Sequence, residues 1–444
     1  MQTMKQTLSQ GMTGKVIIIG ILGILLLLPT SMTESLLLER QERQQQLRTE
    51  VSQQWGEQLL LKAAYLRIPY LIHNTDSDGI RRHDSQQRFL YVLPEYLEID
   101  GHLASEVRHK SLYTVPLYQA RLSVKGHFQR PDMATFGLAK AEVQWHRASF
   151  GIGLSQLKGL QAVEPLILGG KTYSLAAGLP SLKMASQGLS APVKLSAQWQ
   201  ELPFATALTI NATERIEFVP MAQNTKLSLA ADWPDPGFTG AFLPQQQHIT
   251  EEGFSASWQV LGVNRNIPQV LTRNDTFIHD DSHFGVSLII MADVYQQVDR
   301  LIKYMALFIV FTFAALFCSE VLSGTVIHPV QYLLVGLAIV LFYVLLLSLA
   351  EHLGFFMAYV LAATVVTVQI SLYARSLCQY RSLSYWVAGL LVLLYSYFYL
   401  LLQMQDYALL AGAAGLLLLL VAVMYVTRHV DWYDTSAGSF MPSM

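Results

Sequence analysis

One carboxylate, Glu320, stands inside an otherwise apolar stretch that covers residues 304–327. An ionisable side chain within a membrane-spanning helix marks, by default, a functional site or a polar contact between helices. Glu320 lies near the end of its stretch, where a carboxylate can still reach water. We therefore favour a structural or interfacial role over a proton or ion relay, and we keep Glu320 as the candidate functional residue within the membrane.

The densest group of potential metal ligands is His279-Asp-Asp-Ser-His283, with two imidazoles four residues apart. On a helix the two rings would share one face, but the segment is polar and precedes a predicted strand over 286–290. No ligand geometry is fixed there, and a third ligand cannot be named. A solvated loop is the preferred interpretation, no cofactor is expected, and metal binding by His279 and His283 stays open.

A third pattern, Gly169-Gly170-Lys171-Thr172, resembles the end of a phosphate-binding loop. Such a loop needs a glycine five places before Gly170, where the chain has Pro165, and a helix afterwards, which YSLAAGLP does not begin. The pattern therefore predicts a hairpin turn. The sequence also contains no G-x-S-x-G, H-E-x-x-H or C-x-x-C motif. We expect no catalytic residue and no enzyme.

Composition divides the chain into lipid-soluble ends and an ordinary soluble middle. The 444 residues are 52% hydrophobic and 14% charged, which lies outside the usual soluble range. Residues 31–303 hold 25 of the 30 Lys and Arg and 27 of the 32 acids. This near balance excludes an electrostatic footprint for nucleic acid. The two cysteines, Cys318 and Cys378, lie outside the middle, which therefore is no disulfide scaffold.

Six apolar stretches are long enough to cross a bilayer, which takes about 20 apolar residues. The first covers 16–32. No small-residue cleavage site follows Leu28, so we favour a membrane anchor over a cleaved signal peptide. The other five follow the soluble middle and cover 304–327, 329–350, 353–374, 382–405 and 407–427. Their short connections make consecutive helices antiparallel neighbours.

The positions of the basic residues predict the orientation. With the N-terminus inside, every basic residue outside the middle is cytoplasmic, namely Lys5, Lys15, Arg375, Arg381 and Arg428. The outer loops at 351–353 and 403–407 then carry no Lys or Arg. We expect both termini in the cytoplasm and residues 33–303 on the opposite side of the membrane.

The predicted order of domains follows from these spans. It comprises a cytoplasmic tail (1–15), transmembrane helix 1 (16–32), a juxtamembrane helix (33–63), an extracytoplasmic β-rich domain (64–303), which is periplasmic if the family resemblance described below holds, a bundle of five transmembrane helices (304–427) and a cytoplasmic tail (428–444). The juxtamembrane helix rests on apolar residues that recur every four positions. These are Leu47, Val51, Trp55 and Leu59.

From about residue 64 the apolar period changes to two. Apolar residues alternate with polar ones at Tyr118, Ala120, Leu122 and Val124, and again within 193–199, 227–233 and 254–260. Strict alternation indicates strands with one buried and one wet face, which is typical of antiparallel sheets. The fold class is therefore a membrane α+β protein of six transmembrane helices and a large antiparallel, sandwich-like β domain.

Three stretches resemble one known family. They are DWPDPGFTGAFLPQQQHITEEGFSASWQV (232–260), HPVQYLLVGLAIVLFYVLLLSLAEHLGF (328–355) and MYVTRHVDWY (424–433). They closely resemble the inner membrane protein CreD family of Gram-negative bacteria, and the likeness extends over nearly the whole chain. The resemblance implies a cell-envelope integrity protein, linked in the family to colicin tolerance and to a regulon that responds to envelope or β-lactam stress. It supplies no catalytic residue and no ligand.

Two functions from different classes remain open at this point. The first is a non-catalytic factor of the inner membrane whose periplasmic domain binds an envelope protein or a cell-wall component. The second is a transporter or lipid-handling protein that uses the C-terminal bundle, where Glu320 and Tyr395, Tyr397 and Tyr399 could line a path. An enzyme acting on periplasmic glycan or lipid is third. The expected partners are the bilayer and envelope components, and the oligomeric state stays open.

Overall fold

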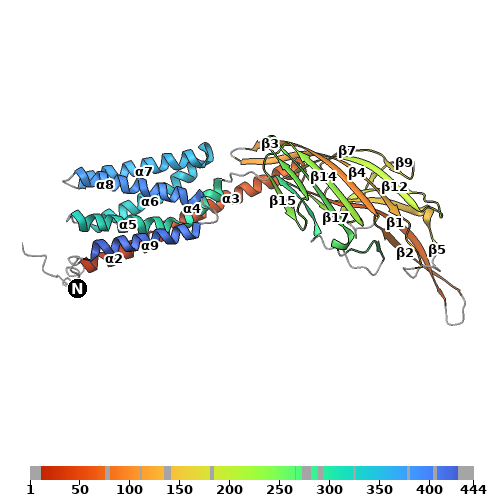
Figure 1. The fold of residues 1–444 in the computed structure, drawn as a ribbon, viewed down its shortest axis with the longest axis horizontal. Coiled ribbons are helices and arrows are strands. Elements are labelled where there is room, and N and C mark those ends of the chain that lie inside the picture. The colour runs from red at the N-terminus through yellow and green to blue at the C-terminus, as the bar shows by residue number, and fades with distance from the viewer. Residues whose placement is uncertain are drawn as a thin grey trace, which may run out of the picture. The chain divides into compact units, whose positions relative to one another are not determined.

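The computed structural model describes residues 12–75, 81–110, 113–134, 142–180, 185–265, 267–272, 282–288, 294–323, 327–377, 381–403 and 408–428 (Figure 1). The contacts divide the chain into two compact units. Residues 1–44 and 292–444 form one, which we call the helical unit, and residues 45–291 form the other, which we call the β unit.

The helical unit is built from helices, most of them apolar, that lie alongside one another (Figure 1). They are α2 (Met12–Leu25), the first part of α3 (Leu27–Trp55), α4 (Val294–Lys303), α5 (Met305–Ser323), α6 (Pro329–Leu353), α7 (Phe355–Leu377), α8 (Arg381–Gln403) and α9 (Ala408–Thr427). Four described helices are long and apolar enough to cross a membrane, and the bent pair of α4 and α5 makes a fifth candidate. The protein is therefore a multi-pass membrane protein with four to five candidate spans.

The helix that follows the first span ends earlier than the sequence suggests. The prediction of a helix to residue 63 is wrong, because α3 ends at Trp55 and strand β1 begins at Leu59. Gly56 takes a φ of 146° and lies so close to the backbone of Asn211 that a side chain would not fit. This backbone stops the helix. Leu59, which the sequence pattern placed on the helix, is the first residue of strand β1 instead.

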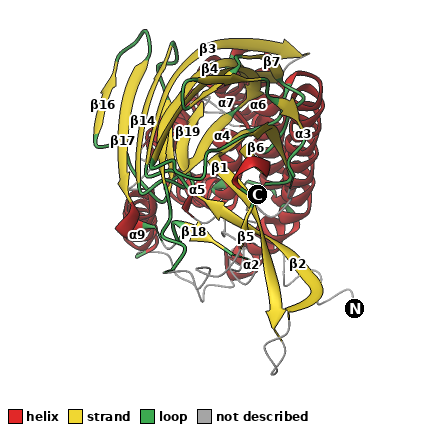
Figure 2. Cartoon of the chain, turned by 90° about the vertical axis from the view of Figure 1, so that its right-hand side faces the viewer, coloured by secondary structure: helices red, strands yellow, loops and turns green. Residues whose placement is uncertain are grey.

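The β unit consists of two sheets in the described part of the chain. The ten-stranded sheet contains β10 (Ala176–Ala177), β11 (Gln187–Val193), β6 (Ala148–Leu154), β1 (Leu59–Thr75), β13 (Arg215–Val219), β19 (Phe284–Leu288) and β15 (Pro236–Gly240) in this order, with β2 (Arg81–Val92) and β5 (Glu142–Val143) also pairing with β1 and β18 (Val270–Leu271) with β2. The nine-stranded sheet contains β16 (Gln246–Ile249), β17 (Phe254–Leu261), β14 (Asn224–Ala231), β3 (Tyr96–Lys110), β4 (Tyr113–Gln129), β12 (Glu201–Thr213), β8 (Leu166–Leu168) and β9 (Lys171–Tyr173), with β7 (Leu160–Val163) on β12. Figure 2 shows β16, β17 and β14 as neighbours at one border of their sheet.

One hydrophobic core joins the inner faces of the two sheets. Phe128 and Phe204 of the nine-stranded sheet contact Phe150 of the ten-stranded sheet, with ring centroids 6.2 and 5.5 Å away. Trp258 likewise contacts Phe284 across the sandwich. The alternation read along β4, β14 and β17 is confirmed, because its apolar members are buried in this core.

Two details of the β prediction are wrong. The sheets are not wholly antiparallel, since β1 pairs with β13 and β14 with β3 in parallel. The alternation of apolar and polar residues shows only which face of a strand is buried. It does not show whether the neighbouring strand runs parallel or antiparallel. The segment 195–199 lies beyond β11 as a turn, although Leu195 and Trp199 are buried. Their spacing matched a strand, but both side chains reach the core from a loop.

Candidate functional site

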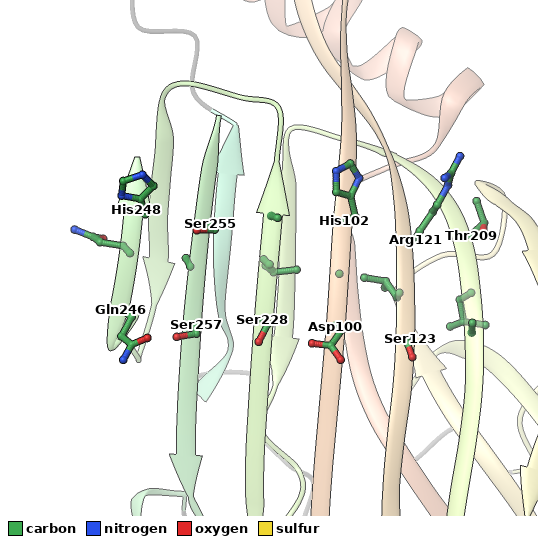
Figure 3. A pocket seen from close by; sticks show the side chains of 18 of the residues that line it. Asp100, His102, Arg121, Ser123, Thr209, Ser228, Gln246, His248, Ser255 and Ser257 are labelled. Carbon is green, nitrogen blue, oxygen red and sulfur yellow. The ribbon is translucent and has the colours of Figure 1, made fainter. Parts of the chain in front are cut away.

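The outer face of the nine-stranded sheet carries polar side chains in two rows that cross the strands (Figure 3). Strand register places the members of each row side by side. The first row consists of Gln246, Ser257, Ser228, Asp100 and Ser123, and the second of His248, Ser255, Ala230, His102, Arg121 and Thr209. Between the rows, Leu122, Leu208, Leu229 and Ala256 are buried in the core.

A groove of about 880 Å³ lies over these rows. Its floor is low because β14 and β17 present only Ser and Ala outward at this level. Longer side chains rise on either side, from Gln246 and His248 on β16 and from His102 and Arg121 on β3 and β4. The alternation of small and large side chains therefore shapes the hollow without any inserted loop.

The groove offers hydrogen-bonding groups of both kinds. Arg121 supplies a cation, and Asp100 and Glu164 supply carboxylates. Next to the groove, Lys226 donates a hydrogen bond of 3.2 Å to Glu98, which raises the pKa of the lysine amine. That pair faces solvent, and its two charges neutralise each other. The ionic groups left at the groove are mixed in sign, so the surface is suited to a polar ligand of mixed charge.

Asp232 lies beyond the second row, at the start of the stretch 232–260. Its carboxylate accepts hydrogen bonds from the amide and the hydroxyl of Ser105, at 2.7 and 2.5 Å. Partial burial raises the pKa of Asp232, but the hydrogen bonds from Ser105 outweigh it and hold the pKa below its ordinary value. This contact joins the end of β14 to β3.

The metal-ligand hypothesis gains no support from the described residues. His279 lies outside them, and the Nε2 atom of His283 is 3.6 Å from Oε1 of Glu217. No group of three or more His, Cys, Asp or Glu that could hold a metal ion occurs in the described ranges. His283 is thus placed beside a carboxylate, in the β unit and away from the groove lining.

The Gly169-Gly170 pattern is a hairpin turn, as predicted. Leu168 pairs with Lys171 across β8 and β9, and the two glycines take φ values of 55° and 76°. Positive φ at both central positions of a two-residue loop is typical of a tight hairpin. The resemblance to a phosphate-binding loop is therefore limited to the sequence pattern.

Glu320 lies in a three-helix contact within the helical unit. Its side chain is 7% exposed. Oε1 pairs with the amine of Lys15 on α2, and Oε2 accepts a hydrogen bond of 2.9 Å from the hydroxyl of Tyr332 on α6. Both carboxylate oxygens thus have partners, and the residue connects α2, α5 and α6. The sequence singled out Glu320 but did not identify Lys15 as its partner.

A second buried carboxylate, Glu351, was assigned by the sequence to an outer loop. It lies instead in the last turn of α6 with 8% of its side chain exposed. It accepts a hydrogen bond of 2.9 Å from Tyr295 of α4 and lies 3.8 Å from Nε of Arg40 on α3. The sequence of α4 shows a short amphipathic helix with Tyr295 on its apolar face, but this pattern does not identify Glu351 as the partner of Tyr295.

The two ion pairs lie at opposite ends of the apolar N-terminal segment. Lys15 and Arg40 are separated by 25 residues, which correspond to about 37 Å of helix at ~1.5 Å per residue. This exceeds the roughly 30 Å of a hydrocarbon core. We infer that both pairs lie near membrane boundaries, where charged groups are least costly.

The three tyrosines of α8 are packing residues in the described structure. Tyr395 is buried against Phe308 and Phe342 at centroid distances of 4.8 Å. The Tyr397 hydroxyl donates a hydrogen bond of 2.6 Å to the carbonyl of Ala411 on α9, directly over Gly415. Ala411 and Gly415, small residues four positions apart on α9, therefore permit close contact between the two helices.

Two solved structures resemble the chain only weakly. An M1 zinc metallopeptidase from Deinococcus radiodurans gives a TM-score of 0.17 at 5% identity, covering 38% of this chain and 38% of that chain. A mutant of an M1 zinc metallopeptidase from the same organism, bound to a Tyr-ser-ala substrate, gives 0.18 at 5% identity, covering 48% and 54%. Scores this low assign neither fold nor activity.

Sequence comparison gives a full-length relationship. The family model described as "Inner membrane protein CreD" matches residues 11–433. The Inner membrane protein CreD of Escherichia coli (strain K12) is 30% identical over 414 residues, which are 92% of this chain and 91% of that protein. The matched range includes both the helical unit and the β unit, so the chain belongs to the CreD family of inner membrane proteins.

Proposed function

We propose that this inner-membrane protein holds its β unit in the periplasm and binds a polar cell-wall component in the groove of the nine-stranded sheet, without catalysis. The observation that carries the proposal is the pair of cross-strand polar rows over a low floor of Ser and Ala. A solvent-facing sheet needs no hollow to fold. Ligand sites are concave and carry a few convergent polar groups that orient the ligand.

The side chains of the groove favour a cell-wall component over a folded protein. Protein interfaces are centred on aromatic anchors, chiefly Trp and Tyr. Among the described residues that line this groove, none is Phe, Tyr or Trp. Hydroxyls, amides, imidazoles and a few charges of both signs complement the hydroxyl, amide, amino and carboxylate groups of peptidoglycan fragments.

The proposed topology has six crossings and both termini in the cytoplasm. We take α9 as the sixth crossing. It is not among the five candidate spans because its apolar part, residues 410–425, is shorter than they are. The support for the orientation is the placement of Lys5, Lys15, Arg375, Arg381 and Arg428 on one side. In this arrangement the protein reports or supports cell-wall integrity under envelope stress.

Transport is the less favoured function. A relay carboxylate must exchange protons or ions during a cycle. Glu320 instead has a cation on one oxygen and a hydroxyl donor on the other. An interhelical tether accounts for both contacts.

The test is binding of soluble peptidoglycan fragments to the full-length protein in nanodiscs, measured by calorimetry. Ser257→Tyr places a large ring on the groove floor and should abolish binding. Gln259→Tyr is the matched control, because Gln259 lies on the same strand and the same face but outside the groove, and it should leave binding unchanged. Absence of binding to the unsubstituted protein, or equal binding by both variants, would refute the proposal.

A further inference from the structure

A second groove, distinct from the polar one, lies between helices of the helical unit. Its volume is about 530 Å³, and it runs between α2 and α5 with α9 at one side. All of its lining residues are apolar, among them Val16, Gly20, Gly23, Ala306, Phe313 and Val423. The glycines and alanines make the helices thin here, so the hollow results from missing side-chain volume.

The ion pairs already described indicate at which level of the membrane this groove lies. Its N-terminal wall extends from Val16 to Leu27. That segment lies between Lys15 and Arg40, whose ion pairs we infer to lie near the two membrane boundaries. The groove therefore lies at the level of the hydrocarbon core, where the surrounding solvent is lipid.

We propose that this groove binds one acyl chain of a membrane lipid. An apolar hollow at this depth excludes a polar solute, since no lining group could replace the hydrogen bonds lost from water. A helix of a second copy would be about 10 Å wide, too wide to enter, and could insert only its side chains. A flexible hydrocarbon chain matches the volume, the lining and the surroundings.

Two glycines make the proposal testable. A Cβ added at Gly20 or Gly23 would meet nothing within 4 Å, and both glycines line the groove. The double variant Gly20→Leu/Gly23→Leu therefore fills the groove without a backbone clash. Gly389 on α8 has the same open space where a Cβ would stand, and it does not line the groove. Gly389→Leu is the matched control.

The experiment uses full-length protein in vesicles of phosphatidylethanolamine and phosphatidylglycerol that contain phosphatidylethanolamine with a photoreactive acyl chain. Crosslinked residues are mapped by mass spectrometry. We expect groove residues to be labelled several-fold more than Leu361 and Val368, which are lipid-exposed on α7. The filled variant should lose the groove labelling and keep the α7 labelling, while Gly389→Leu should keep both.

Two results would overturn the proposal. One is groove labelling no stronger than on α7 and unchanged by filling. The other is a protein–protein crosslink from the groove together with dimers that dissociate in the filled variant, which would assign the groove to a second copy. If the double variant does not accumulate, Ala314→Leu fills the same groove from α5 and is judged by the same readouts.

Discussion

The role inferred for Glu320 depends on the residues that it contacts. Taken alone, a carboxylate in an apolar helix indicates a functional site. Paired with Lys15 and Tyr332, it connects three helices. Glu351 repeats the arrangement with Arg40 and Tyr295. Both buried carboxylates thus bind a base of the N-terminal segment and a tyrosine of another helix, which fixes that segment to the rest of the helical unit.

The Lys15–Glu320 pair is expected to contribute to stability in a non-additive way. Glu320→Gln leaves a buried ammonium without a counterion, which costs roughly 3–5 kcal/mol for a fully buried pair and less where lysine can extend to water. Lys15→Gln/Glu320→Gln removes both charges and should recover much of the loss. Thermal unfolding in detergent measures the cycle. A double variant no more stable than Glu320→Gln would show that the pair does not act as a unit.

Asp232 gives a prediction about pH. Its folded pKa lies below its ordinary value of 3.8, so the ionised carboxylate stabilises the fold. That contribution is complete above the unfolded pKa and disappears as pH falls through the folded one. Asp232→Asn should therefore cost about 1 kcal/mol or less at neutral pH, allowing for solvent screening, and the difference should shrink below about pH 4.

The matched control for Asp232 is Asp235→Asn, three residues further along the chain. Unfolding of both variants is followed between pH 7 and pH 3. An Asp232→Asn deficit of the same size at both ends of this range would contradict a role for the ionised carboxylate.

Among the elements, those with one buried and one wet face were predictable. The β4 alternation and the Gly169-Gly170 hairpin follow from local sequence and are present as expected. The end of α3 was not predictable, because Gly56 is required by a contact with the distant Asn211. The groove escaped prediction for a similar reason. Ser228, Asp100 and Ser123 become one row only through strand register, which no local pattern encodes.

The strand boundary leads to a prediction about isolated fragments. Residues 45–291 should be soluble, rich in sheet by circular dichroism, and indifferent to reductant, since this range contains no cysteine. Residues 64–303 should be less stable, because they lack the part of β1 at 59–62 that pairs with β13. Limited proteolysis and thermal unfolding compare the two fragments. Equal stability would show that this parallel pairing contributes little.

The whole molecule combines a membrane part and a β part in one family-wide arrangement. The family match extends from residue 11 to residue 433, so the family model includes both units. The two cysteines of the chain fall in the helical unit. The β unit can therefore be tagged with single cysteines in a Cys318→Ser/Cys378→Ser background.

This background gives a direct test of topology. Val263 is 85% exposed on the β unit, so Val263→Cys should react with a membrane-impermeant maleimide in intact cells. Ser443→Cys in the C-terminal tail should react only after the inner membrane is permeabilised. The reverse pattern would place the β unit in the cytoplasm and exclude a cell-wall ligand.

The most direct measurement of the central claim is photo-crosslinking from the groove in living cells. A photoreactive amino acid replaces Ser255, which is exposed in the second polar row, or Val263 as a control outside the groove. The groove position should yield an adduct that muramidase digestion shortens, and the control should yield none. No adduct at 255, equal adducts at both positions, or an adduct that muramidase leaves unchanged would contradict binding of a cell-wall component in this groove.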